Sequence, residues 1–228
     1  DSADELGTDG FGGGWIGAWG YRLGARIENL PTGPDRPIVQ PDHRVGCYDL
    51  VLRRTRDGWW LESLGEPDPQ RAADLLAAIN ADAAPQRFEI GAFELTPTAD
   101  EHQQAVSKAL EHIAAGDIFQ VNLCARLEAD FSGDPLDVFC VGVEKLRPAY
   151  AAYVSSPQGE LVSFSPELFL RRIGEEVLTS PIKGTAPLSA DPAELLASAK
   201  NRAENVMIVD LMRNDLGRVC SPGSVRVP

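Results

Sequence analysis

The chain has 228 residues, of which 43% are hydrophobic and 24% charged, as in an ordinary globular protein. Its formal net charge of −13 argues against nucleic acids and anionic membranes as partners, because both require a basic surface. No apolar run approaches the roughly 20 residues that span a bilayer, and no signal peptide opens the chain.

The cysteines and histidines show no spacing that is typical of a metal site. The four cysteines are far apart and form no Cys-x-x-Cys pair, and the three histidines do not share a helix face. We therefore expect reduced thiols in a cytosolic protein.

The N-terminal region is rich in glycine and aromatic residues. Residues 12–17 formally satisfy the dinucleotide-binding pattern G-x-G-x-x-G, but no strand precedes them and no helical periodicity follows. Aromatic residues surround them instead, so we predict a glycine-rich strand or turn. The four prolines within residues 29–43 predict an exposed loop.

The central region alternates between strand-like and helix-like patterns. Thr98 and Glu101 form a capping box, and Asp134-Pro135 is a typical helix start. Regular alternation of apolar and polar residues predicts one strand. The expected elements are a hairpin with strands at 45–55 and 58–64, helices at 69–81 and 98–115, a strand at 118–127 and a helix at 134–147.

The last third of the chain predicts strands in meander order followed by a long helix. We expect strands at 150–156, 160–164 and 167–173, a fourth strand ending at Ser180, and a helix from Asp191-Pro192 to Leu216 that Gly217 closes. Such an order predicts the α+β class with antiparallel sheets.

A tight turn at Pro181-Ile182-Lys183-Gly184-Thr185 follows the fourth strand. Gly184 lets the backbone approach a ligand closely, and a lysine held in such a turn can be desolvated and act as an amine nucleophile. The alternative is an ordinary surface lysine beside a strand turn.

Three further stretches decide between these alternatives. They are Gly116 to Leu123, Ser163 to Leu170 with Glu167, and Glu204 to Arg218. Together with the lysine turn, and in this order, they closely resemble the chorismate-utilising enzymes. Lysine in the turn is similar to the branch that makes aminodeoxychorismate, whereas anthranilate synthases typically carry alanine there.

The resemblance implies two packed antiparallel β-sheets with flanking helices, incomplete in this chain because family members continue beyond it. We expect residues 1–97 to form the N-terminal portion of the fold. Residues 98–228 would form the first part of the chorismate-binding catalytic region.

The resemblance also implies a reaction, the amination of chorismate at C4. Lys183 would attack C2 as a neutral amine, and Glu167 would protonate the departing C4 hydroxyl. Ammonia would then add at C4 and displace the lysine. The alternative for Glu167 is a solvent-facing strand residue.

Binding roles follow from the same resemblance. Gly184 and Thr185 would bind a substrate carboxylate, although Thr185 could instead cap its own turn. Glu204 matches a Mg²⁺ ligand, and Mg²⁺ takes few protein carboxylates. Asn201, one helical turn earlier, stands where family members typically carry an acidic residue.

The expected partners are chorismate and a glutamine amidotransferase subunit or domain that supplies ammonia. Anthranilate synthase and isochorismate or salicylate synthases are the alternative enzymes. A non-catalytic fragment that docks an amidotransferase is the alternative outside the enzymes.

Overall fold

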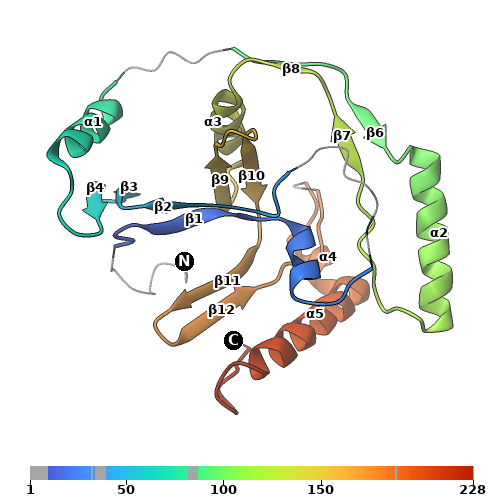
Figure 1. Ribbon diagram of the computed structural model, residues 1–228. Coiled ribbons are helices and arrows are strands. Elements are labelled where there is room, and N and C mark those ends of the chain that lie inside the picture. The colour runs from blue at the N-terminus through green and yellow to red at the C-terminus, as the bar shows by residue number, and fades with distance from the viewer. Residues whose placement is uncertain (1–9, 32, 34–39, 82–86, 188, 228) are drawn as a thin grey trace. The chain divides into compact units, whose positions relative to one another are not determined.

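The computed structural model describes residues 10–31, 33, 40–81, 87–187 and 189–227. The chain divides into two compact units. Unit 1 combines residues Asp1–Asp82 with Val143–Pro228, and unit 2 consists of Ala83–Gly142. Figure 1 follows the chain through its helices and strands.

The first half of unit 1 contains two antiparallel strand pairs, β1 with β2 and β3 with β4. The elements are β1 (Gly14–Trp19), the 3-10 helix η1 (Tyr21–Arg26), β2 (His43–Tyr48), β3 (Leu50–Thr55), β4 (Gly58–Ser63) and α1 (Pro69–Ile79). The glycine-rich stretch is thus a strand, as predicted, and α1 lies where the sequence placed it. The predicted loop at 29–43 includes residues 32 and 34–39, which lie outside the described residues.

The predicted strand at 45–55 is wrong in one respect, because it is two strands with different partners. Asp49 is a bend between β2 and β3, and its carbonyl oxygen accepts a hydrogen bond from Leu64 N at 2.8 Å. Its carboxylate pairs with both terminal nitrogens of Arg71 in α1, at 2.7 and 2.8 Å. The pairing with Arg71 lowers the pKa of Asp49. These contacts hold the bend that separates the two pairs.

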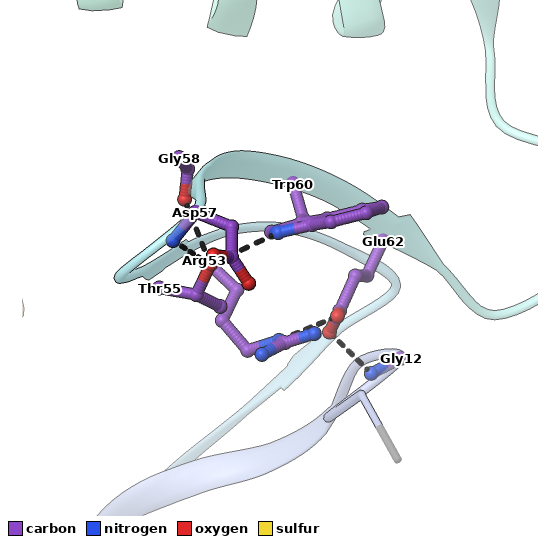
Figure 2. A network of polar contacts seen from close by, with 7 residues as sticks. All are labelled: Gly12, Arg53, Thr55, Asp57, Gly58, Trp60 and Glu62. Atoms are coloured by element: carbon purple, nitrogen blue, oxygen red, sulfur yellow. Dashed lines mark hydrogen bonds and ion pairs between the residues drawn. The ribbon is translucent and has the colours of Figure 1, made fainter. Parts of the chain in front are cut away.

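A carboxylate on β4 ties β1's leading glycines to the β3–β4 hairpin (Figure 2). Glu62 accepts a hydrogen bond from Gly12 N at 3.0 Å and one from Arg53 Nε at 2.5 Å. The Glu62 side chain is only 13% exposed. The Gly12 N–H, and after it Arg53, lowers the pKa of Glu62. We call Gly12, Arg53 and Glu62 the Glu62 latch.

The turn of the same hairpin is organised by one hydroxyl, also visible in Figure 2. Thr55 Oγ1 accepts hydrogen bonds from Trp60 Nε1 at 3.1 Å and from Asp57 N at 3.2 Å. It also approaches the carbonyl oxygen of Gly58 at 3.3 Å. The hairpin turn that the sequence places between the strands ending at 55 and starting at 58 is therefore confirmed.

The second half of unit 1 contains the hairpins β9–β10 and β11–β12, followed by two helices. The helical stretch predicted from Asp191-Pro192 to Leu216 is confirmed except at Ser198, where extended backbone with a ψ of 111° divides it into two helices. Ser198 ends one helix and its hydroxyl caps the next by accepting from Asn201 N at 3.3 Å. The elements are β9 (Tyr150–Val154), β10 (Leu161–Ser165), β11 (Leu168–Ile173), β12 (Glu176–Ser180), α4 (Pro192–Ala197) and α5 (Ala199–Gly217).

Gly217 does not close α5 as predicted. It lies within the helix, and the cap is Arg218 in right-handed helical conformation. The backbone N–H of Arg218 donates to the carbonyl groups of Asp215 and Leu216. The helix therefore ends without the left-handed glycine on which the prediction relied.

Unit 2 contains two short antiparallel pairs, β5 with β8 and β6 with β7. The capping box of α2 is confirmed, since Thr98 N donates to Glu101 at 2.9 Å and Gly116 ends the helix with a φ of 81°. The elements are β5 (Glu89–Ile90), β6 (Glu94–Thr96), α2 (Ala99–Ala115), β7 (Arg126–Glu128), β8 (Phe131–Ser132) and α3 (Pro135–Leu146), whose last residues belong to unit 1.

The strand predicted at 118–127 is wrong over most of its length. Only β7 is a strand, and it pairs with β6, which has three residues. Among the described residues, 118–125 find no partner strand, so their alternating pattern has no ladder to join. Phe119, on the supposed buried face, is 90% exposed.

The α+β class with antiparallel strands is confirmed. Leu50, at 7% exposure, is the one buried residue in the part of the chain that the structure describes. Within that same part, no helix combines the length and the apolar character needed to cross a membrane. The predicted division at residues 97 and 98 stays a prediction.

Candidate active site

The β11–β12 hairpin brings together two of the residues that the sequence selected. Its turn is Gly174-Glu175, with Gly174 at a φ of 57°, and its last pair at the open end is Leu168 with Ser180. Glu167 comes directly before that pair and Lys183 shortly after it. Strand pairing therefore places Glu167 and Lys183 near the same open end of the hairpin, whose strands β11 and β12 are labelled in Figure 1.

The Glu167 side chain contacts the lysine turn directly. Its Oε1 accepts a hydrogen bond from the backbone N–H of Ile182, the residue before Lys183, at 3.1 Å. The backbone of Glu167 is held as well, because its N–H donates to Ser165 Oγ at 3.3 Å. Ser165 Oγ in turn donates to the Glu167 carbonyl oxygen at 3.2 Å. Hydrogen bonds thus hold Glu167 both at its backbone and at its exposed carboxylate.

Lys183 is half-buried, and among the described residues its side chain has neither a hydrogen bond nor an ion pair. An amine nucleophile must be free to reach its substrate, and a side chain without an ion-pair partner meets that requirement.

Gly184 has the conformation and the close contact that the turn motif predicts. Its φ of +80° is in the left-handed region, which other residues rarely adopt. A Cβ built on Gly184 would lie 3.0 Å from Cγ of Asn201 in α5. The lysine turn therefore lies against the first turn of α5. Thr185 follows as an exposed residue.

Glu204 lies one helical turn after Asn201, on the same face of α5. It is half-buried, and within the described residues no hydrogen bond or ion pair of its carboxylate is found. No three His, Cys, Asp or Glu side chains of the described residues group as a metal site. The described residues thus supply no cluster of metal ligands around Glu204, and its role as a Mg²⁺ ligand stays a prediction.

Two contributors to this site were not selected from the sequence. Ser165 orients the Glu167 backbone, and the signal for it was the Ser-Pro-Glu sequence, in which a serine hydroxyl accepts from the N–H two residues later. Asn201 was noted as an unusual residue, but its contact with Gly184 depends on tertiary packing and has no sequence signal. The roles predicted for Glu167, Lys183, Gly184, Thr185 and Glu204 stay predictions.

Comparison with known proteins gives a consistent set of relatives. The sequence pattern of the chorismate binding enzyme family matches residues 2–228. The chain is 38% identical over 225 residues to aminodeoxychorismate synthase component 1 of Klebsiella aerogenes, covering 96% of this chain and 50% of that protein. For the protein of that name from Escherichia coli strain K12 the identity is 37%, with the same coverage. Anthranilate synthase component 1 1 of Haloarcula marismortui is 34% identical, covering 94% of this chain and 50% of that protein.

The fold agrees with a solved structure of this kind. Anthranilate synthase component I from Streptococcus pneumoniae superposes with a TM-score of 0.76 at 24% identity, covering 94% of this chain and 52% of that chain. The chain thus spans about half the length of the relatives it matches. With a family pattern that extends over residues 2–228, the chain belongs to the chorismate binding enzymes.

Proposed function

We propose that the protein carrying this chain aminates chorismate at C4, giving 4-amino-4-deoxychorismate for the folate pathway. The observation that carries the proposal is the hydrogen bond from Ile182 N to Glu167, which ties a carboxyl group to the turn that contains Lys183. Family membership supports chorismate as the substrate. The names of the relatives at 36–38% identity support the C4 reaction.

The reaction divides between the two side chains. The neutral amine of Lys183 attacks C2 of chorismate, the double bonds shift around the ring, and the C4–O bond breaks. Hydroxide is a poor leaving group, so the protonated carboxyl of Glu167 gives its proton to the departing oxygen, which leaves as water. Ammonia then forms the C4–N bond, the double bonds shift back, and the lysine leaves C2.

One oxygen of Glu167 is better suited to that proton transfer than the other. Oε1 is occupied by the Ile182 N–H, which can only donate. Oε2 is therefore the oxygen that carries the proton in this proposal. Holding the carboxyl through Oε1 also limits its rotation, which favours catalysis because proton transfer requires a fixed geometry.

The remaining predicted residues bind substrate and metal in this proposal. Gly184 N–H and the Thr185 hydroxyl bind a substrate carboxylate, and Glu204 is one ligand of Mg²⁺. When bound, Mg²⁺ supplies positive charge that holds a carboxylate of the substrate. Such local charge is needed because the chain has a net charge of −13 and chorismate is a dianion.

The ammonia would come from a glutamine amidotransferase subunit or domain. The words "component 1" in the names of the relatives support a second component. We place the reaction in the cytoplasm, where reduced cysteines are expected.

Anthranilate synthase is the second candidate, favoured by relatives of that name at 34% identity. Lys183 argues against it. In a site with alanine at this position ammonia can add at C2 directly, whereas an amine that already occupies C2 leaves C4 as the position for ammonia.

Product analysis tests the proposal. The full-length protein is incubated with chorismate, Mg²⁺ and ammonium at mildly alkaline pH, and the products are separated and identified by mass spectrometry and NMR. We expect 4-amino-4-deoxychorismate. Anthranilate with pyruvate as the product, or isochorismate formed without ammonia, would contradict the proposal and identify the correct alternative.

A further inference from the structure

The β11–β12 hairpin contains a β-bulge between its regular part and the candidate active site. Leu168 pairs with Ser180, and Arg171 pairs with Leu178. Two residues of β11, Phe169 and Leu170, therefore face the single residue Thr179 of β12. A bulge bends the strand that carries the extra residue and changes the direction of the side chains beyond it. Glu167 is the first residue beyond the regular pairing on that strand.

A side-chain hydrogen bond closes this bulge. Thr179 Oγ1 donates to the carbonyl oxygen of Phe169 at 2.6 Å. The extra residue of a bulge leaves the ladder of backbone hydrogen bonds, so its carbonyl needs another donor. Packing does not hold Phe169 in place, because its side chain is 82% exposed. Among the described residues, the hydroxyl of the half-buried Thr179 is thus the contact that fixes the bulge.

The bulge and the Ser165 turn hold Glu167 from its two sides. Before it, Ser165 Oγ contacts both the N–H and the carbonyl group of Glu167. After it, Leu168 and the bulge set the direction of the strand. Between these anchors, the Glu167 carboxylate reaches Ile182 N at 3.1 Å. A shift of the bulge would move Glu167 relative to the lysine turn.

We infer that Thr179 is a positioning residue, whose hydroxyl fixes the bulge and thereby aims the Glu167 carboxylate at the Lys183 turn. The expected effect of Thr179 on turnover rests on the proposed function. Its expected effect on the position of Glu167 does not. Thr179 touches neither substrate nor reacting atoms in this account. It acts through Glu167.

The test replaces the hydroxyl without changing the shape of the side chain. Thr179→Val keeps the β-branch that suits a strand and removes the donor, and Thr179→Ser keeps the donor. Thr55→Val is the matched control, since it removes a hydroxyl that organises a different hairpin turn. All variants are made in the full-length protein.

The first measurement is hydrogen exchange of the Ile182 amide, which does not depend on catalysis. Losing a well-aligned acceptor should speed exchange in Thr179→Val by about two- to tenfold. Thr179→Ser and Thr55→Val should exchange like the wild type. Glu167→Ala, which removes the acceptor itself, gives the upper limit of the rate.

The second measurement is steady-state kinetics with chorismate. We expect kcat to fall by about 10- to 100-fold in Thr179→Val with little change in KM, because the proton donor is displaced while binding groups stay. Thr179→Ser should restore kcat. The inference about Thr179 is contradicted if the Ile182 amide of Thr179→Val exchanges at the wild-type rate. It is also contradicted if Thr179→Val keeps the wild-type kcat in a protein that is active, and neither result would affect the proposed function. A wild-type protein that forms no aminated product would instead overturn the proposed function.

Discussion

Glu167 and Lys183 lie near the open end of the same hairpin, but they differ in their contacts and in their proposed roles as acid and nucleophile. Glu167 has a defined partner, the N–H of Ile182, whereas the Lys183 side chain has no hydrogen bond or ion pair among the described residues. A held acid and an unpaired amine are the two groups that the C4 reaction requires. The difference comes from the strand register, which places the Glu167 carboxylate within hydrogen-bond distance of Ile182 N.

Replacing Glu167 by glutamine tests the acid. Glu167→Gln keeps the shape and can still accept from Ile182 N, but it cannot protonate the departing hydroxyl. Turnover should fall by about 10²–10⁴-fold with little change in chorismate binding. Stopped-flow binding and steady-state rates of the full-length protein measure both quantities. Glu176→Gln, at the other end of β12, is the control. Near-normal turnover in Glu167→Gln would assign the proton to another group.

Replacing Glu204 by glutamine tests the metal ligand. Glutamine offers a neutral oxygen in place of a carboxylate, so Glu204→Gln should need much more Mg²⁺ for its half-maximal rate. A Mg²⁺ titration of initial rates measures this, with Glu194→Gln on α4 as an exposed control. A titration curve that matches the wild type would remove Glu204 from the proposed site.

At the scale of elements, side-chain contacts join segments that backbone pairing leaves separate. The Glu62 latch connects the glycines before β1 to the β3–β4 hairpin, although β1 pairs only with β2 among the described strands. The Arg44 side chain on β2 donates to the Gly159 carbonyl oxygen in the β9–β10 turn at 2.7 Å. Of these two contacts, the Glu62 latch contains a carboxylate, so it responds to pH.

The Glu62 latch should weaken in acid. The pKa of Glu62 is lowered in the folded protein from its usual value of 4.5, so the ionised carboxylate stabilises the fold at neutral pH. That contribution is present above the unfolded-state pKa and disappears as the pH falls through the folded-state pKa. Glu62→Gln should therefore lower Tm at neutral pH, and the difference from wild type should shrink below about pH 4.

Thermal unfolding followed by circular dichroism at a series of pH values measures this difference. Glu66→Gln, a neighbouring exposed glutamate outside the latch, controls for the loss of one negative charge. A Tm difference that is the same at acidic and neutral pH would show that the ionised form of Glu62 contributes nothing.

Elements with local signals were predictable, and contacts that depend on register were not. The capping box of α2 and the N-cap Asp134 of α3 act within a few residues, so their helices were located correctly. The strand predicted at 118–127 failed because a strand also needs a partner. The helical stretch predicted at 191–216 was located correctly, but its division into α4 and α5 at Ser198 was not predicted.

The candidate site shows the same difference between local signals and contacts that depend on register. Its residues were selected because their motifs are contiguous in sequence, and Gly184 has the positive φ that its turn predicts. The bond between Glu167 and Ile182, the bulge opposite Thr179 and the approach of Asn201 were not predicted. Each depends on which residues face each other after pairing, which alternation alone does not specify.

At the scale of the whole molecule, the chain buries little of its apolar surface. Of the described residues only Leu50 is buried, while large side chains such as Trp15 and Phe169 are 70% and 82% exposed. Exposed apolar side chains in such number usually mark contacts with other parts of a protein. Since the relatives are about twice as long as this chain, measurements of activity belong on the full-length protein.

The most direct test of the account asks whether Lys183 forms a covalent bond to the substrate. The full-length protein is mixed with chorismate and Mg²⁺ without ammonia, and its intact mass is measured. We predict a mass increase equal to chorismate less one water, and no such increase in Lys183→Ala. When ammonium is supplied in a separate reaction, Lys183→Ala should form its new C–N bond at C2. An electrostatic role for Lys183 predicts no adduct and a Lys183→Arg variant that keeps much of its C4 activity, because an always-protonated guanidinium cannot attack. An unmodified wild-type mass together with an active Lys183→Arg variant would contradict the account.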